Sequence, residues 1–311
     1  MTVKVAQEWL AICGGCEVTI LDIGEPLLDL LPELEFVHMP VLHDHKLFGQ
    51  TGEGTKMEIP QADVGIISGS IHTEENEEVA KEMRGKVKTL IAMGSCACYG
   101  GVPALRNLFT VNDLFEAVYR GSISTEEAEE PKVELPPLTD RVMAVSEVVK
   151  VDFQLPGCPT TPEIVVEALT ALLSGTSFKC SDKSVCDECP TRREKKAADG
   201  TALMRPLKMI CQKGTDLTQT LCFIEQGFLC LGPVTRAGCG GKAKIPRCIK
   251  AFMPCRGCFG PLRDDANPMV DMMGALSTVG IPPAQILDRV ATFNRFAGSQ
   301  NRLRPMPAPR K

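Results

Sequence analysis

The cysteine residues of this chain carry its most specific chemistry. Fifteen occur among 311 residues, and the first two, Cys13 and Cys16, are separated by two glycines in the stretch AICGGCEVTI. A Cys-x-x-Cys pair can form a redox-active dithiol, half of a zinc site or half of an iron–sulfur site. The pair alone is compatible with all three, so the choice depends on the other cysteines and on the elements that position them.

Three apolar runs in the first half of the chain each end at a cysteine. VKVAQEWLAI leads to Cys13, KTLIAMGS to Cys96 and VVKVDFQLPG to Cys158, while ADVGIISGS (62–70) precedes an acidic helical pattern. Strands that alternate with helices indicate a doubly wound parallel α/β sheet, in which ligands collect beyond the carboxyl ends of the strands. We therefore expect Cys13, Cys16, Cys96 and Cys158 to converge on one site, which suits zinc or a 4Fe–4S cluster.

The neighbours of these cysteines fit a cluster site. Glycines lie beside them and allow the backbone to approach a cluster closely. Thr161, Pro162 and Glu163 form the start signal of a helix just after Cys158. The alternative is that these cysteines are buried structural thiols, and Cys98, which has no pairing partner of its own, is expected to be one.

A second set of cysteines lies between residues 186 and 258. Its eight members are Cys186, Cys189, Cys222, Cys230, Cys239, Cys248, Cys255 and Cys258. Eight thiolates suit two 4Fe–4S clusters, and because ligands interleave in two-cluster ferredoxins the sequence leaves their division open. Zinc ribbons are the competing interpretation. The wide spacing and the lack of histidine in this half favour iron and sulfide, and the remaining Cys180 and Cys211 are expected to be structural or free thiols.

Composition places the chain among ordinary globular proteins and excludes some functions. Its net charge of −5 gives no electrostatic reason for nucleic-acid binding. We find no signal-peptide pattern, no twin arginine and no run of about 18 apolar residues, so we expect a cytoplasmic protein without a membrane span. Because the cytosol keeps thiols reduced, this cysteine content points to metal binding rather than to disulfides.

Five motifs resemble the small subunits of nickel–iron hydrogenases. They are CGGC, GSCACYGG, PGCPTTPE, CLGPVTRAGCGG and CRGCFGP. Within this family the chain is most similar to the methyl-viologen-reducing hydrogenases of methanogens, which are associated with heterodisulfide reductase. The resemblance extends from residue 3 to about residue 262. Many cytoplasmic relatives have another cysteine soon after AGCG, where this chain has Lys242 and Ala243, with Cys248 further on.

The resemblance implies three segments. Residues 1–175 would form a flavodoxin-like domain that binds a proximal 4Fe–4S cluster through Cys13, Cys16, Cys96 and Cys158. Residues 176–265 would form a ferredoxin-like domain that binds the medial and distal 4Fe–4S clusters through the eight later cysteines. No flavin is expected, because the cysteines occupy the crevice that a flavin would use. Residues 266–311 are expected to be an extension that contacts partners or is partly disordered, since the tail is too polar to build a core.

The resemblance also implies the function. Hydrogen would be oxidised at a nickel–iron centre in a large partner subunit, and three 4Fe–4S clusters here would pass the electrons to a further subunit that links to heterodisulfide reductase. The chain would thus be the iron–sulfur subunit of an oxidoreductase acting on hydrogen, with no catalytic residue of its own. Glu17, next to Cys16, is a candidate for proton transfer, with a surface or capping role as the alternative.

Three other interpretations remain at this stage. The small subunit of a deazaflavin-coenzyme-reducing hydrogenase has similar motifs. An iron–sulfur subunit of another oxidoreductase, such as a quinone-reductase relative, would typically contain adjacent cysteines, and this chain has no Cys-Cys pair. A zinc-stabilised scaffold without a redox role would contain no sulfide.

Overall fold

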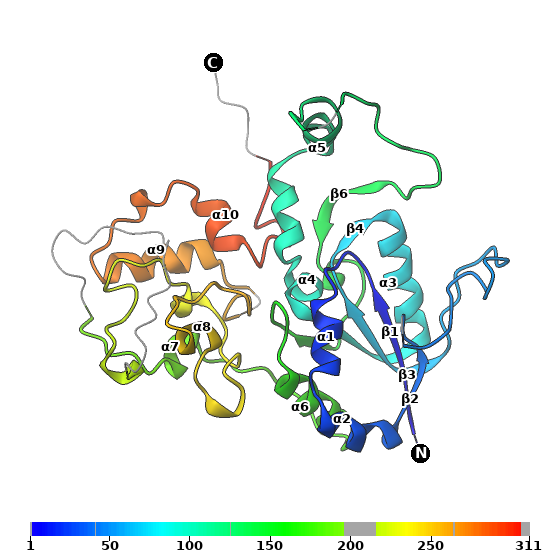
Figure 1. Cartoon of the computed structure of the whole chain (residues 1–311), viewed down its shortest axis with the longest axis horizontal. Helices are drawn as coiled ribbons and strands as arrows, with labels where there is room; N and C mark the ends of the chain where they lie inside the picture. Colours follow the sequence, from blue (N-terminus) through cyan, green and yellow to red (C-terminus); the bar gives the residue numbers. More distant parts are fainter. Residues whose placement is uncertain (1, 41, 125, 196–215, 264, 306–311) are drawn as a thin grey trace.

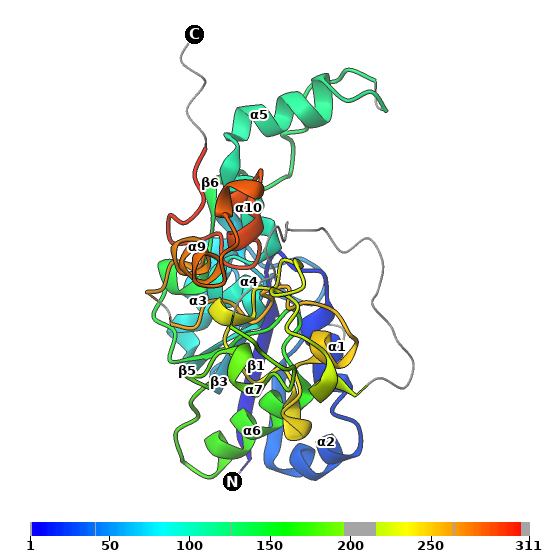
Figure 2. The ribbon, with the colours of Figure 1, turned by 90° about the vertical axis from the view of Figure 1, so that its left-hand side faces the viewer.

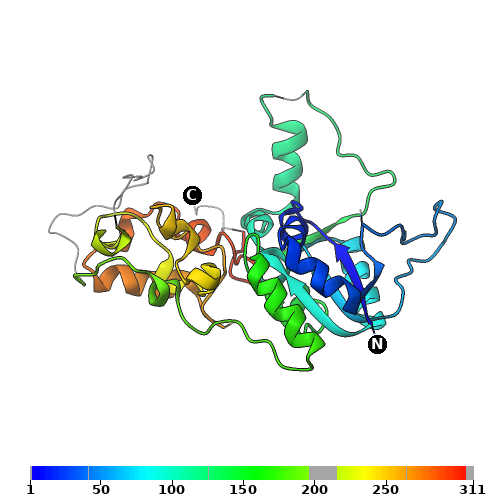
Figure 3. The same ribbon diagram turned by 60° about the horizontal axis from the view of Figure 1, so that its bottom comes forward.

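The computed structural model describes residues 2–40, 42–124, 126–195, 216–263 and 265–305 (Figure 1). The chain forms two parts that lie side by side. The first half builds a sheet flanked by helices, and the cysteine-rich second half builds a group of short helices and loops beside it (Figures 1 and 3). Among the described residues, no helix is long and apolar enough to cross a membrane.

A parallel sheet forms the centre of the first part. Its strands are β1 (Val3–Trp9), β2 (Leu34–His38), β3 (Ala62–Ser68), β5 (Val87–Met93) and β7 (Phe153–Leu155), in the order β2-β1-β3-β5-β7. This is the flavodoxin-like order, which confirms the predicted fold class. The predicted strands near 62–70 and 88–95 are confirmed. The apolar run 148–157 forms a strand only near its end, because a 3₁₀ turn, η4 (Val145–Glu147), and a loop precede β7.

Helices cover both faces of this sheet, so its strands are nearly continuous apolar runs. One face packs against α1 (Gly15–Leu21), α2 (Glu25–Leu30) and α6 (Pro162–Leu173), and the other against α3 (Glu74–Lys86) and α4 (Gly94–Tyr99). The 3₁₀ turn η1 (Leu31–Glu33) joins α2 to β2. The predicted start of α6 is confirmed, because the Thr161 hydroxyl accepts a hydrogen bond from the Ile164 N–H and Pro162 is the first helical residue.

A smaller antiparallel sheet and a projecting arm extend the first part. The sheet pairs β4 (Ile71–Thr73) with β6 (Leu138–Met143). After α4 and before β6 run η2 (Val102–Leu108), α5 (Val111–Phe115) and the π-helical turn η3 (Glu116–Arg120), followed by an acidic stretch. Figure 2 shows α5 and this stretch standing away from the body of the molecule.

The second part contains short helices around its own core. They are α7 (Val185–Glu188), η5 (Leu217–Gln219), η6 (Gly232–Val234), η7 (Gly241–Ala243), α8 (Arg247–Lys250), α9 (Pro268–Thr278), η8 (Pro283–Gln285) and α10 (Arg289–Asn294). Within the described stretches after residue 176, β-pairing is limited to isolated bridges such as Ser184 with Arg236. Phe223, Leu231 and Leu276 are buried in this core.

The C-terminal residues differ from their prediction. Met272 of α9 and Phe293 of α10 belong to the same core as the cysteine-rich segment. Further on, Ala297 is buried against the first part and the Ser299 N–H donates to the Tyr99 carbonyl at 3.1 Å. The expectation that this polar tail builds no core is therefore wrong up to residue 305, because a few small or apolar positions anchor it. Residues 306–311 and Cys211 lie outside the described residues.

His72 of β4 makes stability depend on pH. Burial, and then the nearby Arg106 cation, lower its pKa from 6.5 to about 4. The unfolded chain therefore binds more protons than the folded one between these values, and stability falls as the pH drops from about 6.5 to about 4. We expect a loss of about 1–2 kcal/mol, allowing for solvent screening of a part-buried ring. In His72→Gln, the free energy of unfolding measured in urea should not show this fall between pH 6.5 and pH 4. If it falls as steeply with pH as in the native protein, His72 is not the group responsible.

Candidate iron–sulfur sites

Four cysteines meet where strands of the parallel sheet end. Cys13 follows β1, Cys16 lies in α1, Cys96 lies in α4 just after β5, and Cys158 follows β7. We refer to these as the first cysteine group. Burial raises the pKa of Cys96 to about 12, and the neighbouring Cys158 and Cys13 thiols contribute to this rise. Burial likewise raises the pKa of Cys16 to about 12, with contributions from Glu17, Cys96 and Cys158. The predicted convergence of these four residues is present.

Two glycines leave space for sulfur in this group. Gly94 and Gly101 have φ angles of +83° and +57°, in the region where side chains are strained. A Cβ atom on Gly94 would clash with Cys16 Sγ, and one on Gly101 would lie 2.5 Å from Cys96 Sγ. Any other residue at either position would push a thiol out of the group, so the glycines shape a site around sulfur.

Backbone groups act on the buried sulfur atoms. The Thr160 backbone acts on Cys16 and the Val102 backbone acts on Cys96, and each lowers the pKa of its thiol against the larger effect of burial. These backbone groups stabilise the thiolate, the form that binds metal. A buried thiolate also needs a compensating positive charge, because desolvation disfavours the charged form. These surroundings therefore fit thiolates bound to a metal.

The eight later cysteines fall into two groups, a division that the sequence left open. The second cysteine group is Cys239, Cys248, Cys255 and Cys258, and the third cysteine group is Cys186, Cys189, Cys222 and Cys230. Burial raises the pKa of Cys258 to about 12, and Cys248 and Cys239 are the thiols that contribute most after it. Burial raises the pKa of Cys186 to about 12, and Cys189 and Cys222 contribute to this rise.

Cys255 lies at the boundary between these two groups. Burial raises its pKa well above the usual value, and the next contribution comes from Cys230 of the third group, ahead of Cys258 and Cys248. Its backbone N–H donates to Cys230 Sγ at 3.2 Å. We place Cys255 in the second group because two of that group's members act on it and because it forms a Cys-x-x-Cys pair with Cys258.

Backbone groups and a glycine recur around the second and third groups. The backbone groups that lower the pKa values of their thiols are those of Ile224, Glu225, Gly232, Arg247 and Gly257. A Cβ atom on Gly232 would lie 3.1 Å from Cys186 Sγ and 3.5 Å from Cys230 Sγ. Sequence spacing could not identify these backbone groups, because they depend on how each loop folds around its cysteine. Because backbone groups and a glycine surround these thiols as they do in the first cysteine group, we expect all three groups to bind the same kind of cofactor.

The three groups lie in series. Cys158 of the first group faces Cys258 of the second: its backbone lowers the pKa of the Cys258 thiol and its own thiol raises it. The Cys255 N–H of the second group donates to the Cys230 sulfur of the third at 3.2 Å. These contacts place the second group between the other two, in the order first, second, third.

Each cysteine group offers four thiolates. Across the described residues, no three His, Cys, Asp or Glu side chains are close enough together to hold one ion. A 4Fe–4S cluster spreads four thiolates around several iron atoms, so each group has the number of ligands that such a cluster needs.

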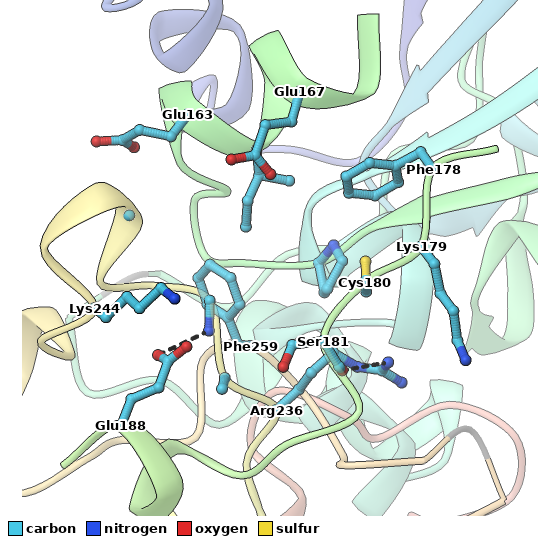
Figure 4. Close-up of a pocket in the computed structure, with 15 residues that line it drawn as sticks. Glu163, Glu167, Phe178, Lys179, Cys180, Ser181, Glu188, Arg236, Lys244 and Phe259 are labelled. Atoms are coloured by element: carbon cyan, nitrogen blue, oxygen red, sulfur yellow. Dashed lines mark hydrogen bonds between the residues drawn. The ribbon is translucent and has the colours of Figure 1, made fainter. Parts of the chain in front are cut away.

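The other two described cysteines lie outside these groups. Cys98 is fully buried in the core beside α3 and α4, which confirms it as a structural thiol. Cys180 lines a cavity of about 200 Å³ between α6 and the second part, and its thiol donates to the Gln154 carbonyl at 3.1 Å. Figure 4 shows acidic and basic side chains around this cavity, where Glu188 accepts from the Gly238 N–H at 3.2 Å. Its mixed charges do not resemble the cysteine sites.

Glu17 is buried next to the first cysteine group. Its Oε1 atom accepts hydrogen bonds from the Ser68 hydroxyl and from Gln7 Nε2, the latter at 3.4 Å. Its Oε2 atom is buried and has no hydrogen-bond partner among the described residues. The surface role considered from the sequence is therefore wrong, while a role in proton transfer stays a prediction.

Comparisons with known proteins place the chain in a family. A family model described as "NADH ubiquinone oxidoreductase, 20 Kd subunit" matches residues 13–172, which span the first cysteine group. The chain is 37% identical over 297 residues to a vhu subunit of the F420-non-reducing hydrogenase of Methanocaldococcus jannaschii, with 95% of both chains covered.

Solved structures agree with this placement. A chain of an NAD⁺-reducing [NiFe]-hydrogenase is 33% identical with a TM-score of 0.52, covering 58% of this chain and 96% of the other. A chain of the [NiFeSe]-hydrogenase of Dm. baculatum shares the fold, with a TM-score of 0.54 over 84% of this chain and 95% of the other at 17% identity. The chain thus belongs to the family of NiFe-hydrogenase small subunits, in the group of the F420-non-reducing hydrogenases.

Proposed function

We propose that this chain conducts electrons, through three 4Fe–4S clusters, from hydrogen oxidation in a large NiFe subunit to an electron-accepting partner. The observation that carries this proposal is the series of three cysteine groups, in which Cys158 faces Cys258 and the Cys255 N–H donates to Cys230 Sγ. A 4Fe–4S cluster supplies one-electron redox chemistry. Three such sites in series provide a path along which single electrons can move.

The ligands follow from the three groups. Cys13, Cys16, Cys96 and Cys158 would bind the proximal cluster. Cys239, Cys248, Cys255 and Cys258 would bind the medial cluster, and Cys186, Cys189, Cys222 and Cys230 the distal one. This division supports Cys248 as a ligand, because it neighbours both Cys239 and Cys258. No flavin is proposed, since the first cysteine group occupies the carboxyl edge of the sheet where a flavodoxin-like fold would bind one.

The protein's part in this function is to hold thiolates and to tune their surroundings. Burial favours the less charged state of a site, while backbone groups that lower the pKa of a thiol favour the more negative one. Both influences act on Cys16, Cys230 and Cys258. The balance between them sets the potential at each site, and Glu17 adds a further polar group beside Cys16.

The first cysteine group lies beside a surface suited to a large partner subunit. Cys13 and Cys158 are exposed. Directly after Cys13, α1 exposes the apolar side chains of Val18 and Leu21. Exposed apolar residues next to a redox site are typical of a protein–protein contact. We propose that the large subunit covers this face and delivers electrons to Cys13 and its neighbours.

The acceptor is proposed from the relatives. The M. jannaschii relative is named as part of an F420-non-reducing hydrogenase, which disfavours the deazaflavin-coenzyme-reducing alternative. We propose a further electron-accepting subunit at the third cysteine group, linking to heterodisulfide reductase, and a cytoplasmic location for the complex. The family model named for an NADH–ubiquinone oxidoreductase subunit keeps the quinone-reductase relative in view, but the hydrogenase relative matches far more of the chain.

Reduction by hydrogen tests the proposed function. In the complex purified without oxygen, we expect hydrogen gas to bleach the visible iron–sulfur absorption and dithionite to bleach it to the same extent. The isolated chain reconstituted with iron and sulfide should respond to dithionite alone, because the nickel–iron site lies on the partner. Bleaching of the isolated chain by hydrogen, or none in the complex, would contradict the proposal.

A further inference from the structure

Ser95 connects loops of two different cysteine groups. It precedes Cys96 in α4 and is 1% exposed. Its hydroxyl accepts a hydrogen bond from the Gly157 N–H at 3.1 Å and donates one to the Cys258 carbonyl at 2.5 Å. Cys258 is 163 residues further along the chain, so this bond joins the two parts of the molecule.

The first cysteine group is itself tied together at this point. The Ser95 N–H donates to the Gly157 carbonyl at 2.7 Å, so Ser95 binds both polar groups of Gly157. Gly157 has a φ of +137°, and a Cβ atom there would clash with Thr160. Ser95 therefore holds the loop before Cys158 against the helix that contains Cys96.

The same loop contacts the second cysteine group a second time. The Ser95 hydroxyl binds the Cys258 carbonyl, while the backbone of Cys158 faces the Cys258 thiol and lowers its pKa. Cys258 is thus bound at its carbonyl oxygen and approached at its sulfur. Both contacts start from the Ser95–Gly157 unit, whose residues adjoin Cys96 and Cys158.

We propose that Ser95 is a positioning residue that sets the separation between the first and second cysteine groups, and with it the rate at which electrons pass between them. This inference rests on the proposed function, since it assumes that both groups bind clusters. The physical reason is burial. Without the hydroxyl, the buried Gly157 N–H and the part-buried Cys258 carbonyl both lose a partner. The loops before Cys158 and around Cys258 then shift to find other hydrogen-bond partners. The distance between the first and second cysteine groups is no longer fixed at one value.

The variant Ser95→Ala tests this in the assembled complex. Iron and sulfide are measured first, and then low-temperature EPR of the dithionite-reduced protein, where neighbouring paramagnetic clusters split and broaden each other's signals. We expect Ser95→Ala to keep its iron and sulfide and to lose the splitting between the first and second sites. Electron transfer between them, followed after rapid mixing with hydrogen, should slow in parallel.

Ser70→Ala is the matched control. Ser70 is also fully buried near the carboxyl edge of the sheet, but its hydroxyl has no hydrogen-bond partner among the described residues. This variant should retain the native EPR spectrum. A native spectrum in Ser95→Ala, or an equal change in both variants, would overturn the proposal.

Two further outcomes are decisive. If Ser95→Ala loses iron, Ser95→Thr, which keeps the hydroxyl, should restore both the iron and the splitting; failure to restore them would also overturn the proposal. Failure of the proposed function appears separately, as native protein without iron and sulfide before any variant is made.

Discussion

Replacing Cys16 by alanine is expected to lower the iron content by about four atoms per chain and to stop electron transfer from the large subunit. Cys16 is a proposed ligand of the proximal cluster with surroundings that leave room for its sulfur. It faces Gly94 and neighbours both Cys96 and Cys158. Iron and sulfide analysis measures the first effect, and hydrogen-dependent reduction of the remaining clusters measures the second.

The matched control for this variant is Cys98→Ala. Cys98 lies two residues from Cys96, yet its side chain is in the core and its thiol donates to the Ala92 carbonyl at 3.3 Å. Removing it should cost some stability and no iron. A full iron content in Cys16→Ala, or an equal loss in Cys98→Ala, would show that the first cysteine group is wrongly assigned.

The division of the eight later cysteines predicts a specific pattern in double variants. Cys189 and Cys222 both lie in the third cysteine group. Cys189→Ala and Cys222→Ala should therefore each lower the iron content by about four atoms per chain, and the double variant should lose no more than either single variant. Cys248→Ala belongs to the second group. Combined with Cys222→Ala, it should cost about eight, because two separate sites are lost. Iron content and the EPR signals of the remaining clusters measure these losses.

The pattern rests on contacts within each group. Cys222 neighbours Cys189, whereas Cys248 neighbours Cys239 and Cys258. Cys180→Ala serves as the control, since Cys180 lies at the cavity beside α6, and it should keep all the iron. If the losses from Cys189→Ala and Cys222→Ala add, or those from Cys222→Ala and Cys248→Ala do not, the eight residues are divided differently.

Part of the fold and of the candidate sites could be predicted from the sequence because their signals are local. Apolar runs marked β3 and β5, and the Thr161-Pro162 pair marked the start of α6. Once a parallel sheet is expected, geometry requires that cysteines after different strands meet at one edge. The first cysteine group follows from that argument before any distance is known.

The rest depends on long-range packing that spacing does not encode. Strand β2, for example, is short, and its sequence does not indicate that it pairs with β1; that pairing depends on tertiary contacts. The division of the eight cysteines requires loops such as that of Gly232 to fold back on Cys186. The contact of Ser95 with Cys258 spans 163 residues. The packing of the C-terminal residues up to 305 was not predicted, because their average polarity hides single buried positions such as Ala297.

If the three cysteine groups each bind a 4Fe–4S cluster, the metal and sulfide content of the chain is fixed. Iron and acid-labile sulfide should be determined per chain in protein purified without oxygen from its native source. The account predicts about twelve of each. About four of each would leave only one of the three sites, and zinc without sulfide would contradict the account entirely.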